Sequence, residues 1–201
     1  MPQADKLVSE CISNFSCAKD EDLASFLAER AVLYEQVARS RTYFIIDEEA
    51  LPVFSVLGYF AISLHTVCLP ESLTNRQIQR LDGFSAKNRQ GRLTALPAYL
   101  IGQLAKNDAL AHCITGRELL GYAFSVIKRL YRETGGRIVA IDCRPIDKLR
   151  KFYSDNGFVQ IGHNEATGLD QFVFMLNNSC IEGSEGHRKL KAFSPMSLEI
   201  K

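Results

Sequence analysis

The chain has 201 residues, of which 46% are hydrophobic and 23% are charged, enough for one sizeable domain with a packed core, or a domain with a tail. The formal net charge of +1 gives no general argument for binding nucleic acid or an acidic membrane surface. No stretch approaches the roughly 20 apolar residues of a membrane-spanning helix, and the polar start MPQADKLVSE has no signal-peptide pattern, so we expect a cytoplasmic protein without a membrane partner.

The N-terminal third predicts one helix followed by strands. Residues 21–38 carry apolar side chains at helical spacing, and Asp20 precedes them as an N-cap. The β-branched and aromatic run at 41–46 predicts a strand, and residues 53–69 predict one or two more. Residues 70–95 are polar, so we expect a surface excursion there, with a short helix near Asn75–Leu81.

A strand–helix–strand succession follows. The continuous apolar run LPAYLIGQLAK at 96–106 predicts a buried strand, and RIVAIDC at 137–143 predicts another. Between them we expect a helix from about Gly116 to Thr134, ended by Gly135-Gly136. Its apolar residues form one stripe: Leu119, Leu120, Ala123, Phe124, Ile127, Leu130 and Tyr131. This succession is a βαβ unit with parallel strands.

The last predicted elements are a short helix at 147–158, closed by Asn156-Gly157, and a strand at 171–176. We therefore expect one domain over residues 1–176 and a polar appendage over 177–201.

The six cysteines are scattered, without a Cys-x-x-Cys pair or a cluster with histidine, which predicts reduced thiols and no metal site. Cys143, between a β-type run and Arg-Pro, is the one thiol near a candidate site, yet a lone cysteine with no histidine nearby is more often a core residue than a nucleophile.

The turn at 111–116 has two interpretations. Thr115 and Glu118 have the spacing of a capping box, which accounts for the turn as a helix start that binds nothing. Its position in a βαβ crossover favours a phosphate site instead, because free N–H groups and the helix dipole attract anions. Arg117 would add a cationic donor, whereas the charge of Glu118 opposes phosphate binding.

Tyr153, in the stretch FYSDNGF, is the second candidate. A tyrosine before a glycine-ended turn is common in plain packing, but a phenol is also a good general acid when its proton reaches a departing thiolate.

Taken together, these segments resemble the GNAT superfamily of acetyl-CoA-dependent N-acetyltransferases, most closely the subgroup with acetyltransferase toxins of toxin–antitoxin modules. The stretches that carry the resemblance are NFSCAKDEDLASFLAERA, TYFIID, GYFAIS, LPAYLIGQLAKN, ITGRELL and FYSDNGF, spread over residues 12–176. The resemblance implies an α/β (α+β) fold with a central mixed, mostly antiparallel twisted sheet flanked by helices. A parallel βαβ crossover would bind acetyl-CoA.

The resemblance also implies roles for single residues. Tyr153 falls on the general acid that protonates the coenzyme A thiolate. The strand before the turn would bind the acetyl and pantetheine parts, and the turn the pyrophosphate. The residues placed at the cofactor are Leu104, Ala105, Lys106, His112, Cys113, Ile114, Thr115, Gly116 and Arg117. Ala111 and Ile114 depart from the polar and glycine positions of the turn, and Gln103 stands where toxin relatives commonly have arginine.

We therefore expect direct acetyl transfer to a primary amine in a ternary complex, with coenzyme A as product and no metal. The general base stays open, with Glu48, Glu49 and Gln103 as candidates by vicinity. The acceptor also stays open between a small-molecule amine and an aminoacyl or peptide amine, and tRNA and a second copy of the chain are candidate partners. The alternative functions are toxin-like acetylation of aminoacyl-tRNA and a GNAT-fold binding or regulatory protein without catalysis.

Overall fold

The computed structural model describes residues 2–18, 20–47, 55–177 and 190–193. Its helices are α1 (Pro2–Ser13), α2 (Glu21–Ser25), the π-helix η1 (Phe26–Arg30), α3 (Ala31–Gln36), α4 (Asn75–Asp82), the 3-10 turn η3 (Asp108–Leu110), α5 (Gly116–Thr134) and α6 (Asp147–Asp155). Its strands are β1 (Arg41–Asp47), β2 (Val56–Cys68), β3 (Lys87–Asn88), β4 (Gly91–Arg92), β5 (Ala95–Lys106), β6 (Ile138–Cys143), β7 (Val159–Asn164), β8 (Leu169–Met175) and β9 (Leu190–Phe193).

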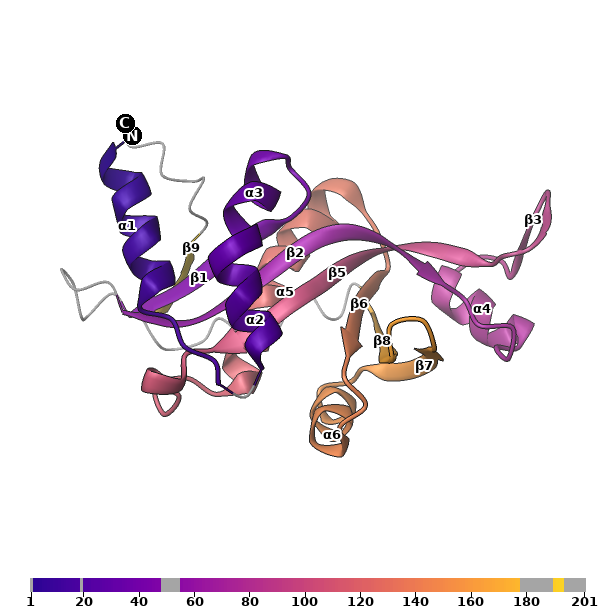
Figure 1. Cartoon of the computed structure of the whole chain (residues 1–201). Coiled ribbons are helices and arrows are strands. Elements are labelled where there is room, and N and C mark those ends of the chain that lie inside the picture. The colour runs from indigo at the N-terminus through magenta and orange to yellow at the C-terminus, as the bar shows by residue number, and fades with distance from the viewer. Residues whose placement is uncertain (1, 19, 48–54, 178–189, 194–201) are drawn as a thin grey trace. The chain divides into compact units, whose positions relative to one another are not determined.

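Seven strands form one sheet in the order β7-β8-β6-β5-β2-β1-β9, and β3 and β4 form a separate hairpin (Figure 1). The pair β5–β6 is parallel, whereas β1–β2, β1–β9, β6–β8 and β7–β8 are antiparallel. The predicted mixed, mostly antiparallel sheet with a parallel βαβ crossover is confirmed.

The chain forms two compact units, and β2, β5 and α5 contribute residues to both. The first unit comprises 1–63, 102–126 and 185–201. Its core lies between the N-terminal helices and the sheet, with Phe26, Leu27 and Tyr59 nearly inaccessible to solvent. The Tyr59 hydroxyl donates to the carbonyl of Leu23 and so fixes α2 to β2.

Gly58 marks a point of close packing in this unit. A β-carbon built on Gly58 would lie 2.8 Å from the Ala105 carbonyl oxygen and 3.3 Å from the Leu119 side chain. The first turn of α5 therefore packs against a strand that has no side chain at this point.

The second unit comprises 64–101 and 127–184. Its core joins α4 to β2, β5, β6 and β8 through apolar residues that include Ile78, Ile138 and Ala140. The end of α5 is tied to β5 by the Tyr99 hydroxyl, which donates to the carbonyl of Gly135 and hydrogen-bonds to the Thr134 hydroxyl.

Most predicted elements are confirmed, including α5 from Gly116 to Thr134, but several were missed. They are α1, the strands β3 and β4, the 3-10 turn η3, β7, and β9 within the segment expected to be an appendage. β9 pairs with β1 along Leu190–Phe193. The part of the chain that the structure describes holds no helix long and apolar enough to span a membrane.

Candidate functional site

The turn between β5 and α5, in the first unit, is held from inside by Lys106 and Asn107. The Lys106 ammonium donates to the carbonyls of Ala111 and Ile114 at 2.8 and 2.9 Å. Lys106 therefore stabilises the turn, because its ammonium group donates hydrogen bonds to main-chain carbonyls of the turn. The Ile114 side chain, 1% exposed, anchors the turn in the core.

The capping box at the start of α5 is confirmed. The Glu118 carboxylate accepts from the amide and the hydroxyl of Thr115, both at 2.7 Å, and the Glu118 amide donates to the Thr115 hydroxyl at 3.1 Å. The amide of Thr115, which was expected to face a phosphate, therefore donates to Glu118 instead. Within the described residues, the amides of Gly116 and Arg117 in the first helical turn have no acceptor, so they stay available to an anion.

Tyr153, in the second unit, lies on α6 and is 7% exposed. Its ring packs edge-to-face against Phe152 and Phe158 and lies 6.0 Å from the ring of Phe172 on β8. Burial, and secondarily the neighbouring Cys143, raise the pKa of Tyr153 above its ordinary value. The phenol therefore carries its proton throughout the neutral pH range, as a general acid must.

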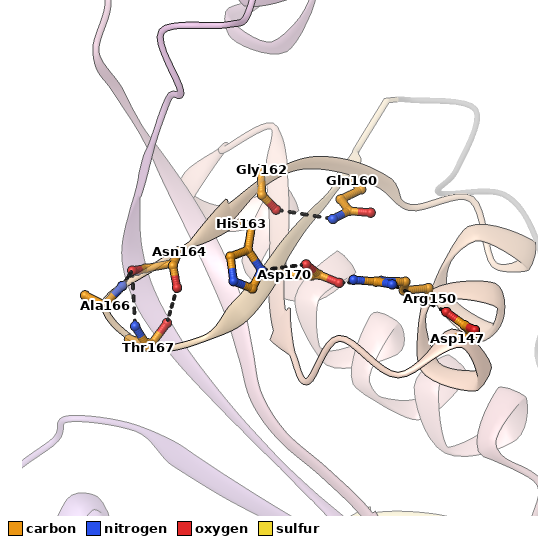
Figure 2. A network of polar contacts seen from close by, with 9 residues as sticks. All are labelled: Asp147, Arg150, Gln160, Gly162, His163, Asn164, Ala166, Thr167 and Asp170. Carbon is orange, nitrogen blue, oxygen red and sulfur yellow. Dashed lines mark hydrogen bonds and ion pairs between the residues drawn. The ribbon is translucent and has the colours of Figure 1, made fainter.

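A buried carboxylate fixes the helix that carries Tyr153. Asp170, on β8 and 1% exposed, accepts from Arg150 Nε at 2.6 Å and contacts His163 Nδ1 at 2.8 Å (Figure 2). Arg150 precedes Tyr153 by one helical turn and also contacts Asp147 at 3.4 Å. Figure 2 shows Asp170 between the arginine of α6 and the histidine of β7, so the network ties both elements to β8.

This network predicts an acid-sensitive contribution to stability. Hydrogen bonds from Arg150 and then His163 lower the pKa of Asp170. Its contribution is therefore complete above the ordinary aspartate pKa of about 3.9 and is lost as the pH falls through the lower folded-state pKa. We expect Asp170→Asn to lower the urea midpoint at pH 7 and to approach the wild type on acidification.

The matched control is Asp155→Asn, which removes an exposed carboxylate paired with Lys151 on the same helix. Exposed pairs contribute little, so its urea midpoint should stay close to that of the wild type at every pH. A constant difference between Asp170→Asn and the wild type down to pH 3 would contradict the role given to Asp170.

Cys143, the last residue of β6, is a buried thiol beside Tyr153. Burial, followed by the charge of Asp170, raises the pKa of Cys143 to about 11, so the thiol stays protonated and unreactive. This agrees with the expected role as a core residue.

The strand β6 continues beyond its pairing with β5. The parallel pairing covers Ala98–Leu100 against Ile138–Ala140, while residues 141–143 pair only with β8 among the described residues. The backbone groups on the β5 side of this strand end are thus left for another partner, such as a thioester oxygen.

No protein-family model matches the sequence, and comparison with curated proteins finds no match. Solved structures do match. AtaT complexed with acetyl-methionyl-tRNAfMet has a TM-score of 0.62 at 21% identity, over 82% of this chain and 86% of that one. A tyrosine-to-phenylalanine mutant of KacT gives 0.63 at 19% identity, over 85% and 89% of the two chains. AtaTR bound with acetyl-CoA gives 0.61 at 21% identity, over 85% and 88%.

The chain has the GNAT fold. The fold expected from the sequence is thereby confirmed.

The structure places the predicted cofactor residues in three settings. Ala105 and Ile114 are core residues and could meet a ligand only through their backbone. Lys106 and Thr115 are engaged within the turn. The remaining residues are half-buried or exposed: Leu104, His112, Cys113, Gly116 and Arg117.

Among the candidate bases, Glu48 and Glu49 lie outside the described residues. Gln103 is half-buried, and its side-chain oxygen has no hydrogen-bond partner in the described structure. A neutral amide accepts hydrogen bonds but does not take up a proton near neutral pH, so Gln103 suits the positioning of a ligand and not base catalysis.

One charged cluster was missed from the sequence. Asp142 on β6 interacts with His65 on β2 and with the Gln171 side chain on β8, within the second unit. Its signal was present only as a carboxylate at the end of a buried strand, a place where cofactor-binding α/β sheets put their functional groups. In the described part of the chain no group of three or more histidine, cysteine, aspartate or glutamate side chains could hold a metal ion.

Proposed function

We propose that this chain is an acetyl-CoA-dependent N-acetyltransferase that transfers the acetyl group directly to a primary amine. The observation that carries the proposal is the buried, protonated Tyr153 next to the last residue of β6, in a chain with the GNAT fold. Among similar structures, AtaTR is bound with acetyl-CoA, and AtaT and KacT include tyrosine-to-phenylalanine mutants.

In the proposed reaction the amine attacks the thioester carbonyl, and a backbone amide at the end of β6 stabilises the oxygen as it becomes negative. The C–S bond then breaks, and Tyr153 gives its proton to the thiolate. Burial raises the pKa of the phenol and would also raise the pKa of the thiol whose thiolate is released beside it. The pKa values of the proton donor and the proton acceptor therefore rise together.

The turn before α5 is the part that we propose for the pyrophosphate. Backbone amides do most of the work in such turns, and Gly116 and Arg117 offer theirs. The exposed His112 and Arg117 side chains would add donors. The Lys106 ammonium donates to carbonyls of the turn, so we give it no contact with the phosphates.

The charge of Glu118 opposes this binding, which yields a test. Glu118→Gln keeps an oxygen for the Thr115 hydrogen bonds and removes the negative charge. Since a charge at a helix N-terminus contributes about 0.3–1 kcal/mol, we expect the Kd of coenzyme A to fall about two- to fivefold. Isothermal calorimetry at low ionic strength measures it, because salt screens the effect.

Glu133→Gln serves as the matched control, since it removes an exposed glutamate from the last turn of the same helix. Its coenzyme A affinity should equal that of the wild type. An unchanged or weaker affinity in Glu118→Gln would place the pyrophosphate away from this turn.

The acceptor that we propose to test first is the α-amine of an aminoacyl-tRNA, because AtaT is seen complexed with acetyl-methionyl-tRNAfMet. The basic run at 148–151 gives less support than its sequence promised, since Arg150 is paired with Asp170 and Lys151 with Asp155. The excursion of α4 and the β3–β4 hairpin is more strongly basic. Its exposed cations include Arg76, Arg80, Lys87 and Arg89.

The deciding experiment has two steps. Calorimetry with acetyl-CoA first tests cofactor binding, and no binding at millimolar ligand would end the enzyme proposal. Labelled acetyl-CoA is then offered with methionyl-tRNA or with L-methioninamide, a small α-amine without RNA. Transfer to methionyl-tRNA alone identifies the toxin-like acceptor, and equal transfer to both identifies a small-amine enzyme. Cofactor binding without transfer to any amine favours the binding or regulatory alternative.

A further inference from the structure

Asp142 lies on β6 beyond the last residue that pairs with β5. The last β5–β6 pair is Leu100 with Ala140, and Asp142 follows two residues later, paired only with Gln171 of β8 among the described residues. The side chain is solvent-accessible, so a ligand at this strand end could reach it. Cys143, its neighbour, is the residue that adjoins Tyr153.

Asp142 and Tyr153 serve opposite faces of β6. Tyr153 packs on Phe172, whose register partner is Ile141, and Ile141 shares its face with Cys143 because side chains alternate along a strand. Asp142 therefore projects from the other face, the one on which Ile138 and Ala140 enter the core beneath α4. A group bound at the open edge of residues 141–143 would have the phenol on one side and the carboxylate on the other.

The groups around Asp142 prepare its carboxylate to take up a proton. His65 from β2 and Gln171 from β8 both act to hold the carboxyl ionised. Partial desolvation by the groups around it outweighs them and raises the pKa of the accessible Asp142 carboxyl above the ordinary aspartate value. Asp170 and Arg150 act on the neighbouring Cys143, as does Asp142 itself. Raised carboxyl pKa values in a cluster of polar groups are typical of general bases.

We propose that Asp142, at the end of β6 that has no pairing with β5, is the general base that accepts the proton of the attacking amine. This inference rests on the proposed acetyl transfer. The C–N bond forms as Asp142 takes the amine proton, and the C–S bond breaks as Tyr153 gives its proton to the sulfur. The Asp142 carboxyl then releases its proton to water and the phenolate regains one, so that amide and thiol are the only products.

Base and acid on opposite faces suit this chemistry. The incoming nitrogen and the departing sulfur are different substituents of the tetrahedral carbon, so each needs its own proton-transfer partner. A neutral amine is also required, and α-amines have pKa values near 7.7–8.0 in solution, so that a large fraction is protonated at pH 7. The neutral fraction of the amine is therefore the form that attacks, and a carboxylate beside the nitrogen directs its lone pair to the carbonyl and takes the proton that is lost as the C–N bond forms.

The test compares Asp142→Asn with the wild type on whichever of methionyl-tRNA and L-methioninamide the wild type acetylates. We expect kcat to fall about 10²-fold with the Kd of acetyl-CoA unchanged. Formate should restore part of the rate in Asp142→Ala, because it can replace the missing carboxylate. The acid limb of the wild-type rate profile should move to higher pH in His65→Gln, which removes a charge that lowers the pKa of Asp142.

The control is Glu165→Gln, an exposed carboxylate in the turn between β7 and β8, whose rate should be that of the wild type. Circular dichroism excludes misfolding as the cause of a loss. A wild-type protein that acetylates no probe would overturn the proposed function and the base together. An active wild type with a fully active Asp142→Asn, or without rescue by formate, would overturn the base alone and leave the proposed function standing.

Discussion

Replacing Tyr153 with phenylalanine is expected to lower kcat for acetyl transfer by 10²-fold or more, within the range that general acids supply, ~10²–10⁴. The change removes one hydroxyl and keeps the ring that packs against Phe158 and Phe172. The free energy of unfolding and the Kd of acetyl-CoA should therefore stay close to the wild-type values. Steady-state transfer of labelled acetyl groups, with calorimetry for the cofactor, measures the two separately.

The matched control is Tyr99→Phe. Its hydroxyl is also buried, but it joins β5 to the end of α5 through Thr134 and Gly135, so its loss should cost about 1 kcal/mol of stability and leave kcat unchanged. A Tyr153→Phe variant with near-normal kcat would remove the phenol from the acid role. A proportional loss of acetyl-CoA affinity would show that the hydroxyl binds the cofactor instead.

The pH profile gives an independent check of the same residue. A general acid works only when protonated, and an ordinary tyrosine would lose its proton near pH 10. Because burial raises the pKa of Tyr153, the alkaline loss of activity should lie above that of an exposed phenol. An alkaline limb well below pH 10 that vanishes in Tyr153→Phe would contradict the environment that the structure gives this side chain.

The sequence predicted the elements whose patterns are strong. The helix α5 combines a capping box, an apolar stripe and a Gly-Gly end, and its predicted bounds at Gly116 and Thr134 are confirmed. The parallel strands on either side of it are equally clear, because buried apolar runs flanking a long helix predict a crossover. These local rules agree with one another over residues 96–143, which is why this part of the fold was predictable.

The missed elements depend on tertiary contacts. In strand β7 only Ile161 is buried, so the sequence lacks the alternation of apolar and polar residues that predicts a strand. The strand forms because it pairs with β8. The helix α1 has a polar sequence with few apolar anchors, among which Cys11 enters the core of the first unit. Such segments become regular because the rest of the fold gives them a partner.

The candidate site could be proposed from the sequence in outline but not in detail. Tyr153 is singled out by a motif, yet Asp142 lies on a strand whose residues were all expected to be core. The register, which ends the β5–β6 pairing at Ala140, is what makes the next residues candidates for a site. Likewise, the family resemblance places Lys106 at the acetyl and pantetheine parts, but no sequence pattern predicts that its ammonium donates to two carbonyls of its own turn.

The second large effect is expected from Asn107, which stabilises the turn before α5 from the other side. Its side chain is 3% exposed and donates to the carbonyls of Asn14 and Val56 at 3.2 and 2.9 Å. Its oxygen accepts from Ser16 and from the amide of Ala109. One buried amide thereby joins the segment after α1, the start of β2 and the turn.

Asn107→Ala leaves the buried carbonyl of Val56 without a donor and also removes the part-buried bonds to Asn14, Ser16 and Ala109. An unpaired buried polar group costs about 1–3 kcal/mol, so we expect a loss of about 3 kcal/mol in the free energy of unfolding. For a chain of this size that corresponds to a fall in Tm of about 6–12 °C. Urea and thermal unfolding followed by circular dichroism measure it, since the chain has no tryptophan for fluorescence.

Asn164→Ala is the control that separates burial from hydrogen bonding. Asn164 also accepts from two backbone amides, those of Ala166 and Thr167, but it lies exposed in the turn between β7 and β8, where water replaces a lost bond. Its substitution should cost well under the loss in Asn107→Ala. Equal losses in the two variants would mean that the bonds themselves, and not their exclusion from water, determine the stability of the turn.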